Sequence, residues 1–431
     1  MSGMLWQKSG IEIDASVMSF LAGEDIILDR ELLEFDIVAS RAHARGLHSI
    51  GALTLEECDA LCNSLDALAE DWKEGNFILD DRYEDGHSAI ESYLTEKLGP
   101  LGGKIHLGRS RNDQVLVALR MYMRASLDRI KDQLVECASA SLERARAHEF
   151  DPMPGYTHLQ RAVPSTVGLW FASFAESFTE SATLVTMTRS WINRCPLGTA
   201  AGYGVNLPLA REEVALDIGF EGLVMNPMTA QASRGKHEHQ TLSAVWQALQ
   251  DVRRLAWDLS LFSTQEFAFV TMPIRTTTGS SIMPNKSNPD LVELLRASQS
   301  VVAGCMNELQ QVLSLPSGYH RDLQLTKGPL IRAINTATGA LNLVPMLIRE
   351  LEFHTDRMLA SIEPSMHATD RAVQLAISGE SFREAYQMVA DQGMDMAIDA
   401  SSSVRSRISP GACGNLMLEE LEARILSCNK V

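Results

Sequence analysis

Apolar residues recur at steps of three and four residues along this chain, and this spacing constrains its fold more than any other feature. One face of a helix is predicted by Leu55, Cys58, Leu61, Cys62, Leu65 and Leu68. The same spacing returns between Val301 and Leu313, and the segments 115–148 and 164–192 are rich in good helix formers. Strand-like alternation is rare and short, so we predict an all-α protein.

A capping box predicts the start of the first of these helices. Thr54 precedes the apolar run, and Glu57 follows three residues later. The hydroxyl and the carboxylate would each accept a hydrogen bond from one of the free backbone N–H groups at a helix start.

The length and the hydrophobic content indicate a large folded protein. A chain of 431 residues is long enough for more than one domain, and 45% hydrophobic residues can fill a sizeable core. Residues 1–10 do not resemble a signal peptide, because they are mixed in character and include Lys8. A membrane span needs about 20 consecutive apolar residues, and no such stretch occurs. We therefore expect a cytoplasmic protein that does not enter a membrane.

The charge of the chain restricts its partners. The formal net charge is -17, with 55 acidic residues against 38 basic ones and no compensating basic run, so we expect no nucleic-acid partner. An acidic protein that handles an anionic substrate needs Lys and Arg side chains gathered in its pocket. The seven cysteines are scattered and odd in number, which indicates buried, reduced thiols rather than a disulfide framework.

The segment 277–289, TTGSSIMPNKSNP, has the composition of a loop that could bind an anion. Its prolines, glycine and hydroxyl residues exclude a regular helix, and such a loop can present N–H groups, hydroxyls and an ammonium to one ligand. A serine becomes a base only when nearby donors and a cation lower its pKa, and Lys286 could supply that cation. An ordinary surface loop would have the same composition.

Two further polar segments are candidates for chemistry. His158 lies in the segment 154–160, PGYTHLQ, and would act as an acid or base if a carboxylate oriented it; a structural histidine is the alternative. Residues 109–114, RSRNDQ, gather donors at the start of a predicted helix, where an anion or merely solvent could be bound. Tyr319, Gln324 and Lys327 form a similar polar group after a proline.

Neither a metal nor a cofactor is expected from the sequence. His237 and His239 are two residues apart on a predicted helix, so they point to nearly opposite sides and do not share one ion. Three glycines lie between Gly198 and Gly204, but no strand precedes them as a nucleotide-binding loop requires.

Together these segments resemble the fumarase/aspartase superfamily and, within it, the argininosuccinate lyases. The loop 279–289 is similar to the superfamily signature G-S-S-x-M-P-x-K-x-N-P, and residues 105–114, IHLGRSRNDQ, are similar to the first segment of the lyases. Residues 154–160 match their second segment. Further similarity covers residues 84–91, 315–327 and 382–386, so the resemblance extends over nearly the whole chain.

The resemblance implies an all-helical protein of three domains with a central bundle of long helices. The implied boundaries are 1–103 for an N-terminal helical domain, 104–355 for the central domain and 356–431 for a small C-terminal helical domain. It also implies a homotetramer with the central domains at its core. Each active site would be assembled from loops of three subunits, which would account for the distance between the motifs in the sequence.

The reaction implied by the resemblance is an anti elimination that splits argininosuccinate into arginine and fumarate, as in arginine biosynthesis, without a cofactor. Ser280 would take the Cβ proton of the succinyl group, and Lys286 and Asn288 would stabilise the aci-carboxylate that develops. His158, held by Glu293, would serve as or activate the acid that protonates the departing nitrogen. Substrate would be bound by Ser110, Arg111, Asn112, Thr157, Tyr319, Gln324, Lys327 and His87. The cationic cluster that an acidic chain needs would then consist of Arg111, Lys286 and Lys327.

Two segments depart from the family's pattern. A turn before the first long helix, which in the family helps to grip the amino-acid end of the substrate, reads Gly23–Glu24–Asp25 here. Residues 233–236 read Ser-Arg-Gly-Lys where Ser-x-Arg-Asp is common, so no role is carried over to them. The alternative functions are a sister lyase that releases fumarate from another substituted succinate, and a structural protein derived from a lyase.

Overall fold

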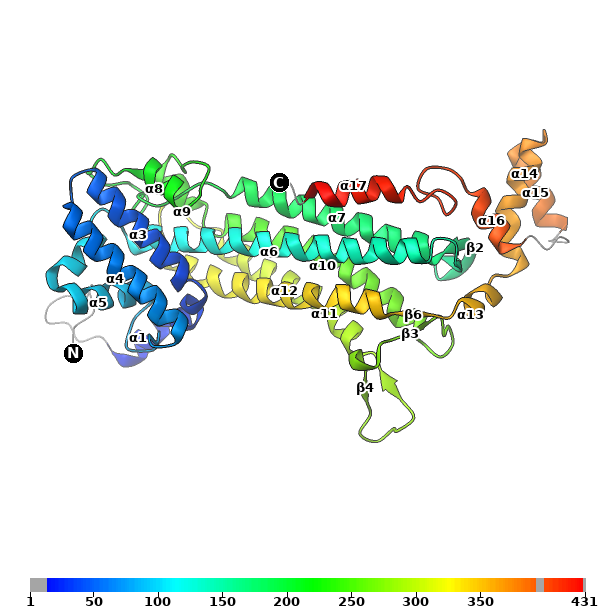
Figure 1. Ribbon diagram of the computed structural model, residues 1–431, viewed down its shortest axis with the longest axis horizontal. Coiled ribbons are helices and arrows are strands. Elements are labelled where there is room, and N and C mark those ends of the chain that lie inside the picture. Colours follow the sequence, from blue (N-terminus) through cyan, green and yellow to red (C-terminus); the bar gives the residue numbers. More distant parts are fainter. Residues whose placement is uncertain (1–13, 393–398, 429–431) are drawn as a thin grey trace. The chain divides into compact units, whose positions relative to one another are not determined.

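The computed structural model of the chain describes residues 14–392 and 399–428, and these residues are mostly helical (Figure 1). The all-α prediction is confirmed, with three short two-stranded sheets among the described residues. Residues 1–10, for which we expected no signal peptide, lie outside the described residues.

The chain forms two compact units, each of which is described by itself. The first takes its residues from 1–128, 185–244 and 302–335, and the second from 129–184, 245–301 and 336–431. The long helices that contribute residues to both units are α6 (Arg111–Ala147), α7 (Val167–Trp191), α10 (Lys236–Phe262), α11 (Asp290–Val312) and α12 (Lys327–Glu350). The division into three domains at 103 and 355 stays a prediction.

The first unit is built around α3, α4 and α5, which lie side by side (Figure 1). The elements that belong to it alone are α1 (Ala15–Ala22), α2 (Asp25–Leu28), η1 (Asp29–Glu31), α3 (Leu33–Ser49), α4 (Leu55–Glu74), α5 (Gly86–Leu98), η2 (Gly99–His106), α8 (Arg211–Asp217), α9 (Pro227–Ala232) and η4 (Arg321–Thr326). The predicted apolar face of α4 is buried from Cys58 to Leu68, except that Cys62 is half-buried. Leu55 departs from the prediction, because it is 57% exposed at the first turn.

The capping box of α4 is confirmed. The Thr54 hydroxyl accepts a hydrogen bond from the Glu57 N–H at 3.2 Å, and the Glu57 carboxylate accepts one from the Thr54 N–H at 3.1 Å. The helix ends at Gly75, whose φ of 78° is the left-handed conformation that a glycine adopts without strain.

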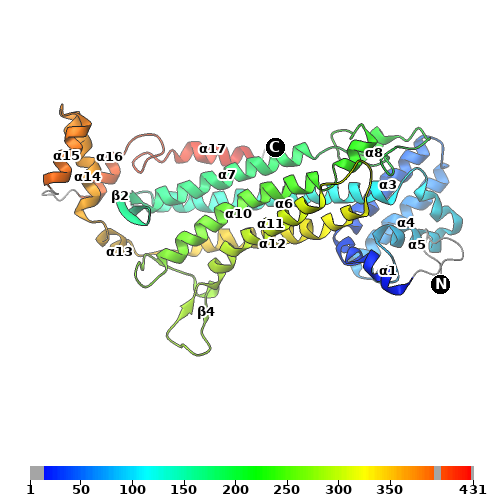
Figure 2. The same cartoon turned by 180° about the vertical axis from the view of Figure 1, so that it is seen from behind.

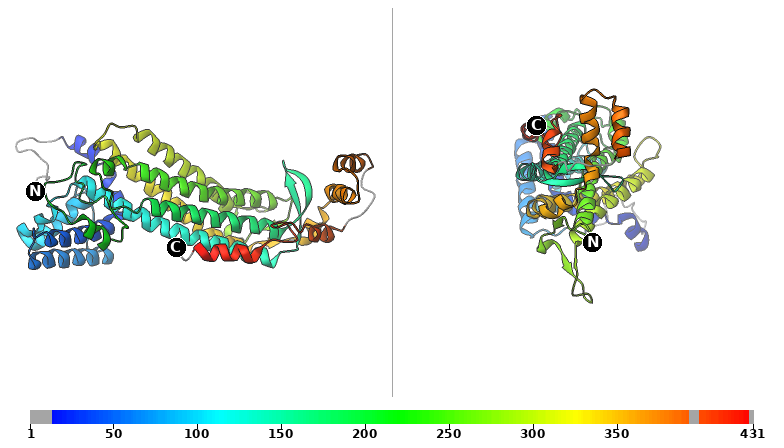
Figure 3. Two further views of the ribbon diagram at one scale, coloured as in Figure 1. Left: turned by 90° about the horizontal axis from the view of Figure 1, so that it is seen from above. Right: turned by 90° about the vertical axis from the view of Figure 1, so that its right-hand side faces the viewer.

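The second unit is formed by parallel and antiparallel stretches of the long helices (Figure 3). Asp258 of α10 accepts a hydrogen bond from the Trp170 indole of α7 at 2.9 Å, and Arg253 of α10 reaches Gln299 of α11 at 2.8 Å. Arg349 of α12 forms an ion pair with Glu136 of α6 at 2.8 Å. The elements that belong to this unit alone are β1 (Pro152–Thr157), β2 (Gln160–Thr166), β3 (Val270–Thr271), η3 (Ile274–Thr276), β4 (Thr278–Gly279), β5 (Ser287–Asn288), β6 (Glu352–Phe353), α13 (Thr355–Ala360), η5 (Pro364–His367), α14 (Ala368–Ile377), α15 (Phe382–Gln392), α16 (Ala400–Ser406) and α17 (Leu418–Cys428).

Two of the polar segments singled out in the sequence form short antiparallel hairpins. The segment around His158 forms β1 and β2, which pair from Pro152 with Thr166 to Thr157 with Gln160. In the segment 272–290, β4 and β5 pair Thr278 with Asn288, and this hairpin stands away from α10 and α11 (Figure 2). The strands of the first hairpin were not predicted from the sequence because they contain prolines, which cannot donate a hydrogen bond to a neighbouring strand.

The cysteine prediction is confirmed. All seven thiols are free; six are buried and Cys62 is half-buried. None of the helices in the described part of the chain is both long and apolar enough to cross a membrane.

Candidate active site

The first unit contains a pocket of about 320 Å³ that brings together six of the predicted substrate-binding residues. They are Ser110, Arg111, Asn112, Tyr319, Gln324 and Lys327. These residues come from the start of α6, from the segment before η4, from η4 itself and from the start of α12. Segments separated by about 200 residues of sequence therefore meet in one unit, as the motif interpretation requires.

The start of α6, which lines this pocket, is fixed by the hydrogen bonds of one buried carboxylate. Asp113, which is fully buried, accepts hydrogen bonds from the Ser110 N–H at 2.8 Å and from the N–H groups of Gly198 and Ala200 at 2.9 and 2.8 Å. The buried carboxylate thereby joins the start of the helix to the glycine-bearing loop, whose function the sequence did not indicate. The start of α6 thus lies at the pocket, where the helix dipole favours an anion.

Lys327 is buried and already compensated by two carboxylates. Its Nζ lies 2.7 Å from Asp25 and 2.7 Å from Asp29, and the second oxygen of Asp29 accepts the Gly86 N–H at 2.9 Å. Burial opposes the charge of this ammonium, but the two carboxylates outweigh burial and raise the pKa of Lys327. One ammonium thus faces two carboxyl groups, and burial raises the pKa of one of them, Asp25.

Arg111 is paired in the same way. Its guanidinium forms ion pairs with Glu84 at 2.9 Å and with Asp85. Burial works against ionisation of Asp85, yet His87, Arg111 and the hydrogen bonds of Ser88 lower the pKa of this carboxyl group. Arg111 and Lys327, two residues of the predicted cationic cluster, both line the pocket, and each is paired with carboxylates of the chain itself.

His87, the remaining predicted binding residue of this unit, is buried behind the pocket. Its Nδ1 contacts the Asp36 carboxylate, and its Nε2 is buried without a hydrogen-bond partner among the described residues. Burial lowers the basicity of the ring, but Asp36 and the neighbouring carboxylates raise the pKa of His87 overall. The neighbouring carboxylates therefore favour the charged form of the ring.

Sequence reasoning missed four charged residues that line this pocket. These residues are Asp25, Asp85, Arg234 and Arg321. Asp25 lies in the turn whose departure from the family was noted, and Asp85 lies inside the EDGHSAIE segment, so both had a signal in the sequence. Arg234 had none, because its segment does not follow the family's pattern.

The predicted acid, His158, lies at the tip of the β1–β2 hairpin in the second unit. His158 and Leu159 form its two-residue turn with φ values of 55° and 57°, and both are exposed. Left-handed backbone costs roughly 1–2 kcal/mol for each residue other than glycine. Thr157 precedes the tip and is also exposed.

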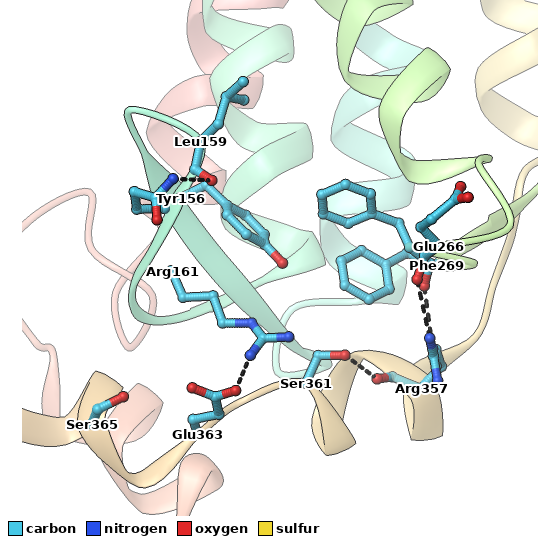
Figure 4. Close-up of a pocket in the computed structure, with 11 residues that line it drawn as sticks. Tyr156, Leu159, Arg161, Glu266, Phe269, Arg357, Ser361, Glu363 and Ser365 are labelled. Atoms are coloured by element: carbon cyan, nitrogen blue, oxygen red, sulfur yellow. Dashed lines mark hydrogen bonds and ion pairs between the residues drawn. The ribbon is translucent and has the colours of Figure 1, made fainter.

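The flank of this hairpin borders a hollow of about 570 Å³, shown in Figure 4. Arg161 of β2 forms an ion pair with Glu363 across it, and the Arg357 guanidinium donates to the Glu266 carbonyl at 3.0 Å. Tyr156 packs edge-on against Phe267 with ring centroids 5.6 Å apart. Tyr156 and Arg161 face each other one pair away from the turn, so these contacts hold the hairpin close to its tip.

The signature loop forms the β4–β5 hairpin and its turn. The Ser280 hydroxyl oxygen accepts hydrogen bonds from the N–H groups of Ile282 at 3.4 Å and Met283 at 3.1 Å, which favour negative charge on that oxygen. Lys286 and Asn288 line a hollow of about 440 Å³ at the end of α10, and Lys286 is exposed. Glu293 lies in the first turn of α11 and is paired with Arg296 at 3.4 Å.

The chain by itself does not bring all predicted catalytic residues into contact. No hydrogen bond or ion pair joins His158 to Glu293 within the described residues of one chain. The pocket residues of the first unit and the loops of the second are each described within their own unit. In the described parts of the chain, no group of three or more His, Cys, Asp or Glu side chains is arranged to hold a metal ion.

Comparison with known proteins bears on the family. A family profile described as "Lyase" matches residues 10–304. An argininosuccinate lyase of Xanthomonas oryzae pv. oryzae is 50% identical over 426 residues, covering 98% of this chain and 99% of that protein. One from Xylella fastidiosa is 51% identical over 426 residues and covers 98% and 96%. The chain belongs to the argininosuccinate lyase family.

Solved structures agree on the fold of this family member. The crystal structure of EDDS lyase in complex with formate superposes with a TM-score of 0.80 at 24% identity, covering 97% of this chain and 92% of that one. A class II fumarase from Schistosoma mansoni gives a TM-score of 0.71 at 15% identity, with 87% and 88% covered. The resemblance read from the motifs and the fumarase/aspartase-like fold are both confirmed, and the members of this family are carbon–nitrogen lyases.

Proposed function

We propose that this protein cleaves argininosuccinate to arginine and fumarate by an anti elimination that uses no cofactor. The observation that carries the proposal is the pocket of the first unit, which gathers Ser110, Arg111 and Asn112 with Tyr319, Gln324 and Lys327. The relatives that are 50% and 51% identical over nearly their whole length carry the name of this activity. The cytoplasmic location and the role in arginine biosynthesis expected from the sequence belong to the same proposal.

Ser280 is the base of the proposed reaction. Its oxygen, stabilised by the N–H groups of Ile282 and Met283, takes the Cβ proton of the succinyl group. The electron pair of that C–H bond first charges the neighbouring carboxylate, which Lys286 and Asn288 stabilise, and then forms the Cα=Cβ bond of fumarate. The C–N bond breaks, and the departing guanidine nitrogen receives a proton by way of His158.

In this scheme the substrate is bound by residues of the pocket and by Thr157 of the β1–β2 hairpin. Ser110, Arg111 and Asn112 offer donors at a helix start to the succinyl carboxylates, and Thr157 adds a hydroxyl. Tyr319, Gln324 and Lys327 hold the rest of the molecule. His87, whose Nε2 has no hydrogen-bond partner among the described residues, is the remaining residue that we assign to substrate binding.

We further propose that the working enzyme is a homotetramer whose active sites combine loops of different subunits. His158 lies at an exposed tip, and the signature loop stands away from the helices of its unit (Figure 2). A shared site requires catalytic side chains such as His158 that are exposed and lie apart from the other catalytic residues of their own chain. Glu293 would meet the His158 of a neighbouring subunit, since the two residues have no contact within one chain.

The direct test is to incubate purified protein with argininosuccinate and to measure fumarate by its ultraviolet absorbance and arginine by chromatography. We expect both products in equal amounts. No fumarate at roughly millimolar substrate, where enzymes of this kind are saturated, would reject the proposal. Fumarate from another substituted succinate, but not from argininosuccinate, would instead identify a sister lyase.

A further inference from the structure

Arg234 is a buried cation of the substrate pocket that forms no ion pair with the carboxylates in the described part of the chain. The residue is 3% exposed and lines the pocket together with Asp25. No ion pair within 4.0 Å joins its guanidinium to a carboxylate of the described residues, and its Nε is buried without a hydrogen-bond partner there. A buried charge without a partner is costly, so a site that retains one is built for an anionic ligand.

The backbone around Arg234 is held so that this side chain faces the pocket. Arg120, itself buried, donates to the Ser233 hydroxyl at 2.8 Å and to the Arg194 carbonyl at 2.7 Å. Glu238 accepts the Gly235 N–H at 2.7 Å. Together these bonds fix the turn on both sides of Arg234.

Gly235 is the residue that this turn requires. Its φ is +81°, and a Cβ built on it would lie 2.0 Å from a methyl carbon of Leu313. A side chain at this position, such as the arginine of the family's common pattern, would clash with Leu313 and strain the backbone. The chain therefore forms this turn with Ser-Arg-Gly-Lys instead of the family's Ser-x-Arg-Asp. Its arginine stands one position earlier than the arginine of the family's pattern.

The surroundings of Arg234 match the two charges of an amino-acid head group. Arg234 lies close enough to Asp25 and to the buried Glu238 to favour ionisation of both carboxyl groups, although it forms no ion pair within 4.0 Å with either. Asp25 and Asp29 share the single ammonium of Lys327, and Asp25 is the one of the two that lines the pocket. A separated cation and carboxylate can bind an α-carboxylate and an α-ammonium side by side.

We propose that Arg234 binds the α-carboxylate of the arginine moiety, while Asp25 receives its α-ammonium group. The succinyl carboxylates are assigned to other residues under the proposed function, on which this inference rests. The third carboxylate of argininosuccinate is then assigned to Arg234, a buried cation that forms no ion pair with a carboxylate of the described residues. Arg321 also lines the pocket, but it is exposed and donates to the Leu21 carbonyl at 3.0 Å. Arg234 is thus a specificity-determining residue that selects an amino acid as the leaving amine.

The reverse reaction tests this assignment directly. Arginine or agmatine, which has the same guanidine but lacks the α-carboxylate, is added to saturating fumarate, and the loss of fumarate absorbance gives kcat/KM for each amine. We expect the natural protein to prefer arginine by at least about a hundredfold, because a site built for a charged group rejects the analogue that lacks it. In Arg234→Gln this preference should fall by roughly a hundredfold through loss on arginine alone, the scale of one charge-assisted bidentate contact.

Each amine is measured on the same preparation, so the ratio does not depend on how much protein is folded. Lys236→Gln removes the same charge from an exposed position of the same turn and should keep the natural ratio. Arg234→Lys should give a ratio of arginine to agmatine kcat/KM between those of the natural protein and Arg234→Gln. If Arg234→Gln does not fold, the ratio measured for Arg234→Lys is the test. Equal losses on arginine and agmatine, or a natural protein that does not discriminate between them, would overturn the assignment. A natural protein that adds no amine to fumarate would overturn the proposed function instead.

Discussion

Ser280 owes its proposed reactivity to a short local arrangement. Its oxygen accepts two backbone hydrogen bonds, from Ile282 and Met283, in a turn that contacts little else. We expect Ser280→Ala to lower kcat at least roughly a thousandfold, because the base and part of the charge stabilisation are lost together. Steady-state assay of fumarate release measures the loss, and thermal unfolding should be nearly unchanged because the side chain is only half-buried.

A matched control lies next to it. Ser281→Ala makes the same chemical change in the same turn, at an exposed side chain to which we assign no role. Its kcat should stay within about threefold of the natural value, as is usual for an exposed position outside the chemistry. Near-normal turnover of Ser280→Ala would remove Ser280 as the base.

His43 gives a prediction about pH and stability. The ring is buried, with its Nε2 2.9 Å from the Leu107 carbonyl, and burial together with Arg109 lowers the pKa of His43 to about 3. The unfolded chain binds a proton at this ring below its ordinary pKa of 6.5, whereas the folded chain does not until about pH 3. Stability is therefore lost as the pH falls through this window, by up to about 1.4 kcal/mol per pH unit.

The variant His43→Gln isolates that contribution. Its amide can donate to the Leu107 carbonyl but binds no proton, so the stability of the variant relative to the natural protein should rise on acidification. The gain between pH 6.5 and 4 should be on the order of 3 kcal/mol, measured by urea unfolding at each pH. A stability difference that does not change with pH would contradict the neutral, buried state of this histidine.

At the scale of single residues, the sequence identified those whose chemistry is visible in their type and motif. Ser110, Arg111 and Asn112 were predicted and do line a pocket. The compensation of Arg111 and Lys327 was not predictable, because it depends on carboxylates that only the fold brings to them. Arg234 was not predicted for a related reason. Its position depends on a turn that needs glycine at residue 235, because a Cβ there would lie 2.0 Å from Leu313.

At the scale of elements, the capping box of α4 makes a measurable contribution to the free energy of unfolding. We expect Thr54→Ala to lower the free energy of unfolding by about 1 kcal/mol, because the Glu57 N–H loses its acceptor at the helix start. Thr54→Ser keeps the hydroxyl and should restore most of that loss. Urea unfolding of both variants measures the difference, and equal stability of Ala and Ser at this position would show that the cap contributes nothing.

The long helices were predictable because their apolar spacing and helix-forming composition are local properties. The segments 115–148 and 164–192 correspond to α6 (Arg111–Ala147) and α7 (Val167–Trp191), with shifts of a few residues at their starts. The β1–β2 hairpin was not predicted, because Pro152, Pro154 and Gly155 interrupt any strand pattern. Its pairing comes from the tight turn at His158 and Leu159, whose conformation is unusual for both residue types.

At the scale of the whole molecule, the separation of the catalytic residues leads to the shared-site proposal. His158 and Ser280 belong to two hairpins of the second unit, and the substrate pocket belongs to the first. If each site takes His158 and Ser280 from different subunits, a mixed tetramer contains some sites in which both residues are natural. Random mixing of two variants gives about a quarter of such sites, because each of the two residues is natural with a probability of one half.

We therefore predict that His158→Asn and Ser280→Ala, each nearly inactive alone, recover activity when they are mixed under conditions that exchange subunits. The recovered activity should approach about a quarter of that of the natural protein. Differently tagged copies of each variant show by pull-down that mixed tetramers have formed. A mixture of two separately tagged Ser280→Ala preparations, treated identically, should recover nothing. Proven mixed tetramers without activity would mean that His158 and Ser280 act from the same subunit, because only then does every site lack one of the two residues.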